Sequence, residues 1–203
     1  CTGVEPKVAE DSGQVFLESY TSAYAEGTIA ELEEITGKKI HAFSRKQVEE
    51  EEKSILAMAK KNNVALLTVG NPLTATTHVQ LLLDAKKEWV KVRVIEGISV
   101  TNAITRTGLD EYRFGRTTTI VEPSHGYAPE SFFGFIEKNF DAGLHTLCLL
   151  DTGNGEKLMT AARGLELLEK IAQKKKKKFL AKTPIILLGG RTSEKEKIIS
   201  GFL

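Results

Sequence analysis

Residues 64–72 read VALLTVGNP, and this stretch decides the fold class. Its first six residues are almost all apolar, and Gly70, Asn71 and Pro72 then break the regular structure. A short, continuous apolar run is typical of a strand in a parallel sheet that helices cover on both faces. We therefore expect an α/β fold with a buried strand at residues 64–69.

Outward from this strand, apolar runs alternate with segments of helical spacing. Further strands are expected at residues 15–17, 39–43, 90–95, 117–121, 146–150 and 185–188, and helices at residues 28–35, 44–60, 76–88, 99–108, 129–141 and 159–173. Strands that alternate with helices imply parallel connections. Residues 1–14 show no apolar period and are expected to be irregular, whereas the start of a further helix is expected after the last strand.

Residues 105–116 lack strong periodicity and separate two sets of alternating elements. We place a domain boundary near Gly115, which gives an N-terminal α/β domain at residues 1–115 and a C-terminal α/β domain at residues 116–203. In the helix at residues 129–141, the spacing predicts four inward side chains: Phe132, Phe133, Ile136 and Phe140.

Charge and cysteine content narrow the function classes. Lys and Arg together number 28 and Asp and Glu 27, whereas proteins that bind nucleic acid usually show a basic excess. No apolar run approaches the roughly 20 residues that span a bilayer. The two cysteines, Cys1 and Cys148, form no zinc or disulfide pattern. We expect a cytoplasmic protein that binds neither nucleic acid nor membranes.

Three candidate sites follow strands, at residues 70–73, 97–100 and 150–153. Ligands of open α/β sheets bind beyond the carboxyl ends of the strands. Each candidate also has a local explanation, since Gly-Asn-Pro is a common turn, Ser99 can cap a helix and Asp151 can cap a turn. Together they predict a pocket without specifying its ligand.

Several familiar sites are missing from the sequence. No GxGxxG follows a strand, and no Walker A or GxSxG motif is present. The four histidines are scattered, with no cysteine or carboxylate at ligand spacing, so we expect no metal site. No catalytic residue can be assigned from these patterns.

Five segments in order resemble the diphthine synthase family of the tetrapyrrole methylase-like superfamily. They are VFLESYTS (residues 15–22), TVGNPLTATTH (68–78), GLDEYRFG (108–115), GLHTLCLLD (143–151) and the helix that begins near residue 159. The block at residues 68–78 is the most specific, because related methylases of this fold do not share its Ala-Thr-Thr-His run. This likeness extends from about residue 15 to residue 188.

The resemblance implies a methyltransferase that uses S-adenosylmethionine (SAM) and releases S-adenosylhomocysteine, with the SAM site in a cleft between two α/β domains. By position, cofactor contacts fall on Asn71, Thr74, Ser99, Val100, Leu150 and, near the end, Gly190 or Arg191. The implied acceptor is the modified histidine of elongation factor 2, a precursor of diphthamide. The family also implies a homodimer, and the phenylalanines of residues 129–141 are more than one helix face can hide.

The sequence departs from the family pattern at three places. Asn71 stands where the family has Asp, and Asn accepts hydrogen bonds but carries no charge. The family's Gly-rich first strand is expected before Val15, but residues 1–14 do not resemble it. The family's last strands are expected after Leu203. Two alternatives stay open: another methylase of this fold, acting on a tetrapyrrole or RNA, and a divergent binding module without catalysis.

Two polar segments are candidates for contact with a protein substrate. Residues 153–157 form a hydrophilic stretch after a strand, suited to the mouth of a cleft. The lysine run at residues 174–178 is either a solvated loop or a surface for an anionic partner.

Overall fold

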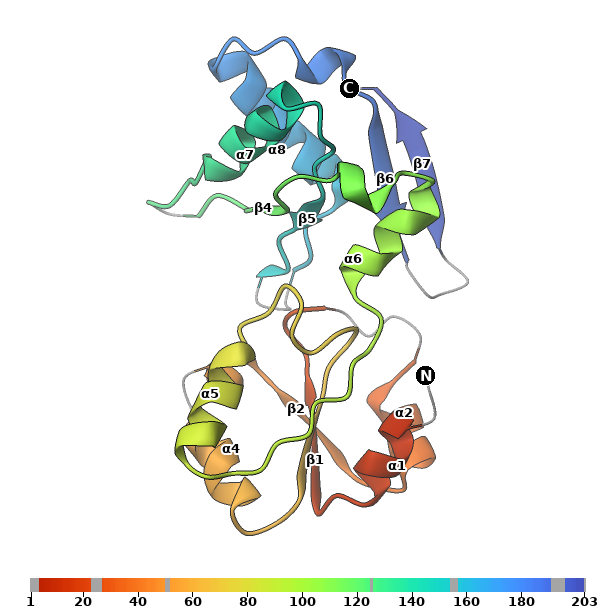
Figure 1. Cartoon of the computed structure of the whole chain (residues 1–203), viewed down its shortest axis with the longest axis vertical. Helices are drawn as coiled ribbons and strands as arrows, with labels where there is room; N and C mark the ends of the chain where they lie inside the picture. The colour runs from red at the N-terminus through yellow and green to blue at the C-terminus, as the bar shows by residue number, and fades with distance from the viewer. Residues whose placement is uncertain are drawn as a thin grey trace. The chain divides into compact units, whose positions relative to one another are not determined.

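The computed structural model describes residues 4–22, 27–49, 52–124, 126–153, 157–190 and 196–202 (Figure 1). Contacts divide the chain into two compact units, Cys1–Asn102 and Ala103–Leu203. Gly115 falls within the second unit, where its N–H donates to the carbonyl of His145 at 2.9 Å. The domain boundary near Gly115 stays a prediction.

The first unit is built on a parallel sheet of three strands in the order β2-β1-β3. They are β1 (Gln14–Glu18), β2 (Ile40–Phe43) and β3 (Val64–Leu67). In register, Val15 of the central strand lies opposite Ile40 on one side and Ala65 on the other. The expected parallel arrangement is confirmed, whereas the expectation of a buried strand at residues 64–69 is wrong in part, because β3 ends at Leu67 and only its Ala65 is buried.

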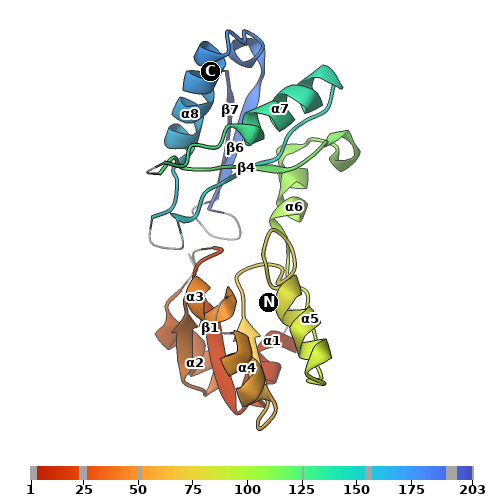
Figure 2. The ribbon, with the colours of Figure 1, turned by 90° about the vertical axis from the view of Figure 1, so that its left-hand side faces the viewer.

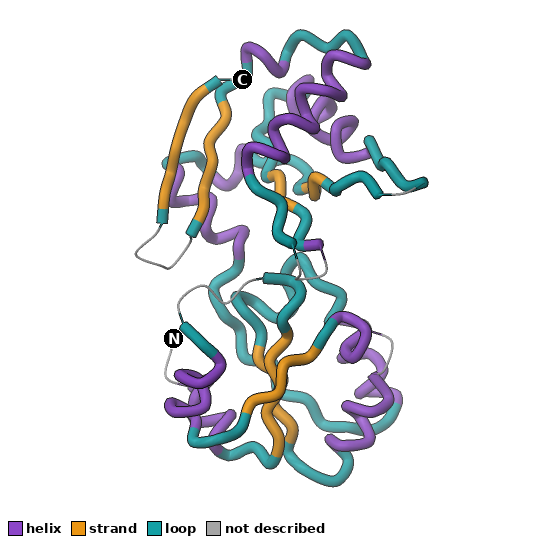
Figure 3. Tube along the Cα trace, turned by 180° about the vertical axis from the view of Figure 1, so that it is seen from behind, coloured by secondary structure: helices purple, strands orange, loops and turns teal. Residues whose placement is uncertain are grey.

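Helices cover both faces of this sheet (Figures 1 and 3). The described helices that lie wholly in this unit are α1 (Val4–Glu10), α2 (Ile29–Thr36), α3 (Arg45–Glu49), α4 (Glu52–Ala59) and α5 (Val79–Lys87), while the division between the units falls within α6 (Val100–Ala103). Alternate residues of β1 point to opposite faces. Val15 and Leu17 pack in a core with Ala9 of α1, whereas Phe16 packs in a second core with Ile55 of α4.

The ends of α2 follow directly from the sequence. The hydroxyl of Thr28 accepts the N–H of Glu31 at 3.2 Å, and the carboxylate of Glu31 accepts the N–H of Thr28 at 2.6 Å. This reciprocal pair is a capping box. Gly37 ends the helix with a φ of 62°, a left-handed conformation that glycine adopts without a steric penalty.

Two expectations for the first unit are wrong. Residues 4–10 are not irregular but form α1, whose Ala9 is 1% exposed. Residues 90–95 are fully described, and none of them belongs to a strand. Val92 and Val94 are instead 47% and 38% exposed, because alternation supplies one apolar face but cannot supply a neighbouring strand.

The second unit holds two separate two-stranded sheets (Figure 2). β4 (Thr118–Ile120) runs parallel to β5 (Cys148–Leu150), and β6 (Ile185–Gly189) runs antiparallel to β7 (Lys197–Gly201). The helix expected to start after β6 is therefore wrong, since residues 197–201 form a strand. The described part of this unit also contains the short helices η1 (Ile104–Thr107), η2 (Glu111–Arg113) and η4 (Leu180–Lys182).

The core of the second unit lies between β4, β5 and two longer helices, α7 (Ser131–Asp141) and α8 (Ala161–Lys174). Its buried members are Ile120, Phe132, Phe133, Ile136, Leu167, Leu168, Ile171, Ala172 and Leu180. Phe140 was expected inward but is 44% exposed. Asn139 is buried instead, because its amide donates to the carbonyl of Arg116 and to the hydroxyl of Thr146, both at 2.9 Å.

The lysine run after α8 is largely paired with acids of the same unit. Lys174 and Lys175 bind the carboxylate of Glu130 at 2.7 and 3.0 Å, and Lys177 pairs with Glu137. These two carboxylates offset two of the five positive charges of the run. The run therefore stays positive, and both the solvated loop and a surface for an anionic partner stay open.

Candidate functional site

The loop after β3 is organised by the side chain of Asn71. Its Oδ1 accepts the N–H of Leu73 at 2.9 Å and the hydroxyl of Thr74 at 3.2 Å. Its Nδ2 donates to the carbonyl of Gly97 at 3.4 Å. One amide side chain therefore folds residues 71–74 into a turn and also ties that turn to the segment after α5.

Gly70 and Gly97 let these two segments approach each other at the backbone. A Cβ on Gly97 would lie 2.2 Å from the carbonyl oxygen of Gly70, closer than real atoms come. Gly70 itself has a φ of 94°. The structure thus brings two of the three sequence-predicted segments together, although residues 90–95 supply no strand for the second.

Ser99 and Val100 stand at the start of α6. Ser99 is 6% exposed, and its hydroxyl accepts the N–H of Thr101 at 3.1 Å. Its own N–H donates to Oδ1 of Asn102 at 3.2 Å. Ser99 is therefore a helix cap, the local explanation left open by the sequence, whereas Val100 is 42% exposed and accessible.

A buried polar network that the sequence pattern did not reveal lies under the first loop. His78 is 5% exposed, with Nδ1 2.9 Å from the carbonyl oxygen of Pro72 and Nε2 3.3 Å from the hydroxyl of Tyr20. Tyr20 follows Glu18, whose carboxylate is 1% exposed and accepts the N–H groups of Tyr20 and Thr21, both at 2.6 Å. The available signal was a charged residue directly after the apolar run of β1.

In the second unit, Leu150 ends β5 and Asp151 orders the loop that follows. The two carboxylate oxygens of Asp151 accept the N–H of Gly153 at 2.9 Å and the N–H of Glu122 at 3.0 Å. Gly164 of α8 lies close to Leu150, because a Cβ there would be 2.9 Å from its side chain. Asp151 therefore caps a turn and links the chain segments after β4 and β5. Of residues 153–157, residues 154–156 lie outside the described part of the chain.

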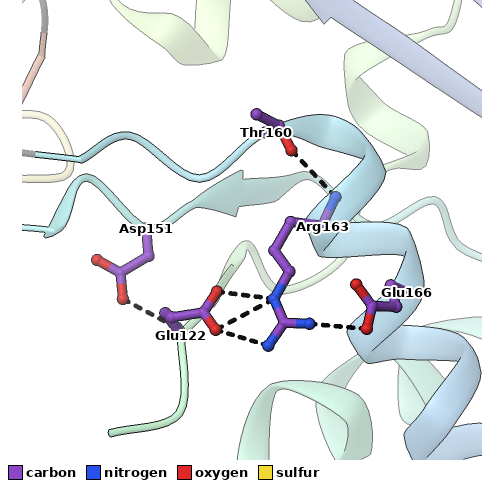
Figure 4. Close-up of polar contacts among 5 residues, drawn as sticks. All are labelled: Glu122, Asp151, Thr160, Arg163 and Glu166. Atoms are coloured by element: carbon purple, nitrogen blue, oxygen red, sulfur yellow. Dashed lines mark hydrogen bonds and ion pairs between the residues drawn. The ribbon is translucent and has the colours of Figure 1, made fainter.

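An ion-pair cluster lies beside this loop (Figure 4). The guanidinium of Arg163 binds Glu122 through Nε, 3.1 Å from both oxygens, and through Nη2 at 2.7 Å, and it binds Glu166 at 2.8 Å. The hydrogen bond from Arg163 holds the pKa of Glu122 below its ordinary value, and the carboxylates raise the pKa of Arg163. Nearby in β5, burial raises the pKa of the Cys148 thiol to about 11.

Gly190 follows β6 with a φ of 62°, while Arg191 lies outside the described residues. Leu150 at the end of β5 and Gly190 just after β6 therefore belong to the strand ends of two different sheets. The structure joins Asn71 and Thr74 to the segment that leads into Ser99 and Val100. Cofactor binding by all six candidate residues stays a prediction.

Two further properties concern the described part of the chain. Within it, no group of three or more histidine, cysteine or acidic side chains is arranged to hold a metal ion. No helix there is long and apolar enough to cross a membrane.

Comparison with known proteins shows which family this chain resembles. The family model for Tetrapyrrole (Corrin/Porphyrin) Methylases matches residues 6–203. The diphthine synthase of Methanocaldococcus jannaschii is 38% identical over 199 residues, which cover 96% of this chain and 77% of that protein. The diphthine synthase of Methanococcus aeolicus is 37% identical over 195 residues, covering 95% and 76%.

Solved structures agree with the sequence relatives. A crystal structure of diphthine synthase matches with a TM-score of 0.84 and 29% identity, covering 96% of this chain and 73% of that one. A putative diphthine synthase from Entamoeba histolytica matches with a TM-score of 0.84 and 32% identity, covering 97% and 77%. These matches confirm the expected α/β methylase fold. The chain belongs to the tetrapyrrole methylase family.

Proposed function

We propose that this chain is a SAM-dependent methyltransferase that carries out the diphthine synthase reaction of diphthamide biosynthesis. The observation that carries the proposal is the 38% identity to the M. jannaschii diphthine synthase along 96% of the chain. The loop geometry supports it, since two segments predicted to bind the cofactor are held together by Asn71 and by the Gly70–Gly97 approach.

The residues present fit such a cofactor. The proposed binding residues are Asn71, Thr74, Ser99, Val100, Leu150 and Gly190. In the first unit the hydroxyl of Thr74 can still accept a hydrogen bond from an adenosyl group, whereas the amide of Asn71, already bound to Leu73, Thr74 and Gly97, would shape the loop around it. Val100 adds an accessible apolar surface.

Methyl transfer requires the chain mainly to align the methyl donor with the acceptor. When bound, SAM supplies a methyl group attached to a sulfonium, and the sulfur becomes a neutral thioether once the methyl group is transferred. The loops of the chain must therefore orient donor and acceptor at about 3–3.5 Å and exclude competing water. The ordered turn at residues 71–74 and the cap at Ser99 provide fixed backbone groups for that purpose.

The proposal also covers the methyl acceptor, the cellular location and the oligomeric state. We take the acceptor to be the amine of the modified histidine side chain on elongation factor 2, and the working form to be a cytoplasmic homodimer. The partly exposed Phe140 of α7 is a candidate interface residue. Light scattering that gives the mass of a single chain at micromolar concentration would remove the dimer.

Radiolabelled methyl transfer tests the activity. We expect label to pass from SAM to elongation factor 2 that bears the unmethylated precursor, and no label when the target histidine has been replaced. Labelling of the replaced protein would contradict the acceptor site. Label on RNA or on a tetrapyrrole instead would support the rival methylases.

Calorimetry with SAM tests the binding site separately from turnover. Val100→Arg places a cation at an accessible position of the predicted site, so we expect the Kd to rise at least about tenfold. Val79→Arg is a matched control, because Val79 is 47% exposed in the same unit but lies on α5. SAM binding without methyl transfer would indicate a binding module.

A further inference from the structure

The buried network of Tyr20, His78 and Pro72 has no part in the proposed chemistry, yet it joins two strand ends. Tyr20 lies just beyond β1, and Pro72 lies in the loop after β3. His78 is 58 residues from Tyr20 in sequence and stands immediately before α5. The imidazole therefore bridges the loop that holds Asn71 and Thr74 to the central strand of the sheet.

The partners of the imidazole fix its tautomer. The carbonyl of Pro72 can only accept a hydrogen bond, so Nδ1 of His78 must carry the proton. In the neutral ring Nε2 is then an acceptor, and the hydroxyl of Tyr20 donates to it. The chain of donors thus runs in one direction, from Tyr20 through His78 to Pro72.

Pro72 sits at the centre of the proposed cofactor loop. It lies between Asn71, whose amide shapes the turn, and Leu73, whose N–H that amide binds. A fixed Pro72 carbonyl holds the peptide plane between Pro72 and Leu73, because a peptide unit is rigid. Any rotation of that plane would move the Leu73 N–H away from Asn71.

We infer that His78 is a positioning residue, which holds the loop at residues 70–74 in its cofactor-binding conformation by anchoring the Pro72 carbonyl to Tyr20. The role in SAM binding rests on the proposed function, whereas the ordering of the loop does not. Glu18 extends the anchor, because its carboxylate fixes the N–H groups of Tyr20 and Thr21 at the end of β1.

Three variants separate this role from simple core packing. His78→Leu removes both hydrogen bonds, and we expect the Kd of SAM to rise about tenfold, together with faster hydrogen exchange at the Leu73 N–H. His78→Asn keeps a donor at the Nδ1 position and is expected to bind SAM within about threefold of the wild type. Tyr20→Phe removes one hydroxyl and is expected to raise the Kd about threefold.

Ile40→Ala is the matched control. Ile40 is 4% exposed in the core on the other face of the sheet, so its truncation lowers the thermal midpoint without touching the loop. We expect its Kd for SAM and its Leu73 exchange to match the wild type. If His78→Leu does not fold, Tyr20→Phe carries the comparison through its exchange at the Leu73 N–H.

The outcomes are distinguishable from a failure of the proposed function. Unchanged Leu73 exchange in both His78→Leu and Tyr20→Phe, or in whichever of them folds, would overturn the inference, whatever SAM does. Faster Leu73 exchange in the variants, together with no SAM binding by the wild-type protein, would leave the anchor intact and reject the cofactor. A ¹⁵N spectrum with the proton of His78 on Nε2 would also overturn the inference.

Discussion

The loops after β3 and β5 both follow the carboxyl end of a parallel strand, yet they are held by different kinds of interaction. The first depends on hydrogen bonds of the Asn71 amide and the His78 imidazole, with the buried Glu18 behind them, and on a backbone contact between two glycines. The second depends on charges, with Asp151 capping the turn and Arg163 paired to Glu122 beside it.

The difference lies in burial as well as in charge. His78 is 5% exposed, whereas the side chains of Arg163 and Glu122 are 38% and 44% exposed. Neutral buried hydrogen bonds are insensitive to salt, while exposed ion pairs are screened and contribute little to stability. The loop after β3 is therefore expected to be the more rigidly fixed, as a loop that binds a cofactor must be.

The largest expected effect comes from filling the backbone contact in the first loop. Gly97→Ala would place a Cβ 2.2 Å from the Gly70 oxygen and 2.9 Å from its carbonyl carbon, and neither atom belongs to a flexible side chain. We expect the free energy of unfolding to fall by about 3 kcal/mol in denaturant titration.

Gly134→Ala is the control for this substitution. Gly134 lies within α7, and a Cβ there would meet nothing within 4 Å. Alanine has a higher helix propensity than glycine, so the free energy of unfolding of this variant is expected to rise by up to about 1 kcal/mol. Equal stability of the two variants would mean that the Gly70–Gly97 contact does not exist in solution.

A smaller effect is expected from the amide that links the two segments. Asn71→Asp keeps the acceptor for Leu73 but loses the donor to Gly97, and it places a carboxylate against that carbonyl. We expect a loss of about 1 kcal/mol in the free energy of unfolding at pH 7. Asn63→Asp, at an exposed position of the same unit, should change stability by much less.

The close contact in the second unit should be more tolerant. In Gly164→Ala the new Cβ would meet a methyl group of Leu150 at 2.9 Å, and a side chain can turn away where a backbone cannot. Alanine also favours α8. We expect these terms nearly to cancel, with a change below about 1 kcal/mol by thermal unfolding. A loss as large as that of Gly97→Ala would erase the contrast between the two loops.

The smallest effect concerns the exposed ion pair. The folded-state pKa of Glu122 lies below its ordinary value of 4.5, so the pair stabilises the fold above that pH. This contribution is lost as pH falls through the lowered pKa. Arg163→Met should return the pKa of Glu122 toward 4.5 in a ¹³C titration, with a slight loss of stability at neutral pH that high salt removes.

Glu166→Gln serves as the control for the ion pair. It removes only the other partner of Arg163, so the pKa of Glu122 should stay low. A raised pKa of Glu122 in this variant would show that the two carboxylates act on each other through Arg163 rather than separately.

The sequence by itself determined where most of the helices and strands lie. The apolar runs that became β1, β3 and β6 stand out because the transfer of apolar side chains from water drives folding. Their burial differs, since β1 is buried from Val15 to Glu18, whereas β3 buries only Ala65 and β6 is at most half-buried. From the sequence we expected only that a helix starts near Thr28. The structure shows that Thr28 and Glu31 form a capping box there. The candidate segment at residues 70–73 also came from the sequence, because strand ends and turn residues are local signals, whereas Thr74 was implied only by the family resemblance.

What only the tertiary structure decided are the contacts between distant segments. No local pattern shows that residues 90–95 lack a partner strand, that residues 197–201 pair with β6, or that Asn139 rather than Phe140 turns inward. The bridge from Tyr20 to His78 spans 58 residues. Periodicity reports which side of an element is apolar, whereas pairing and hydrogen bonding depend on what the rest of the chain places beside it.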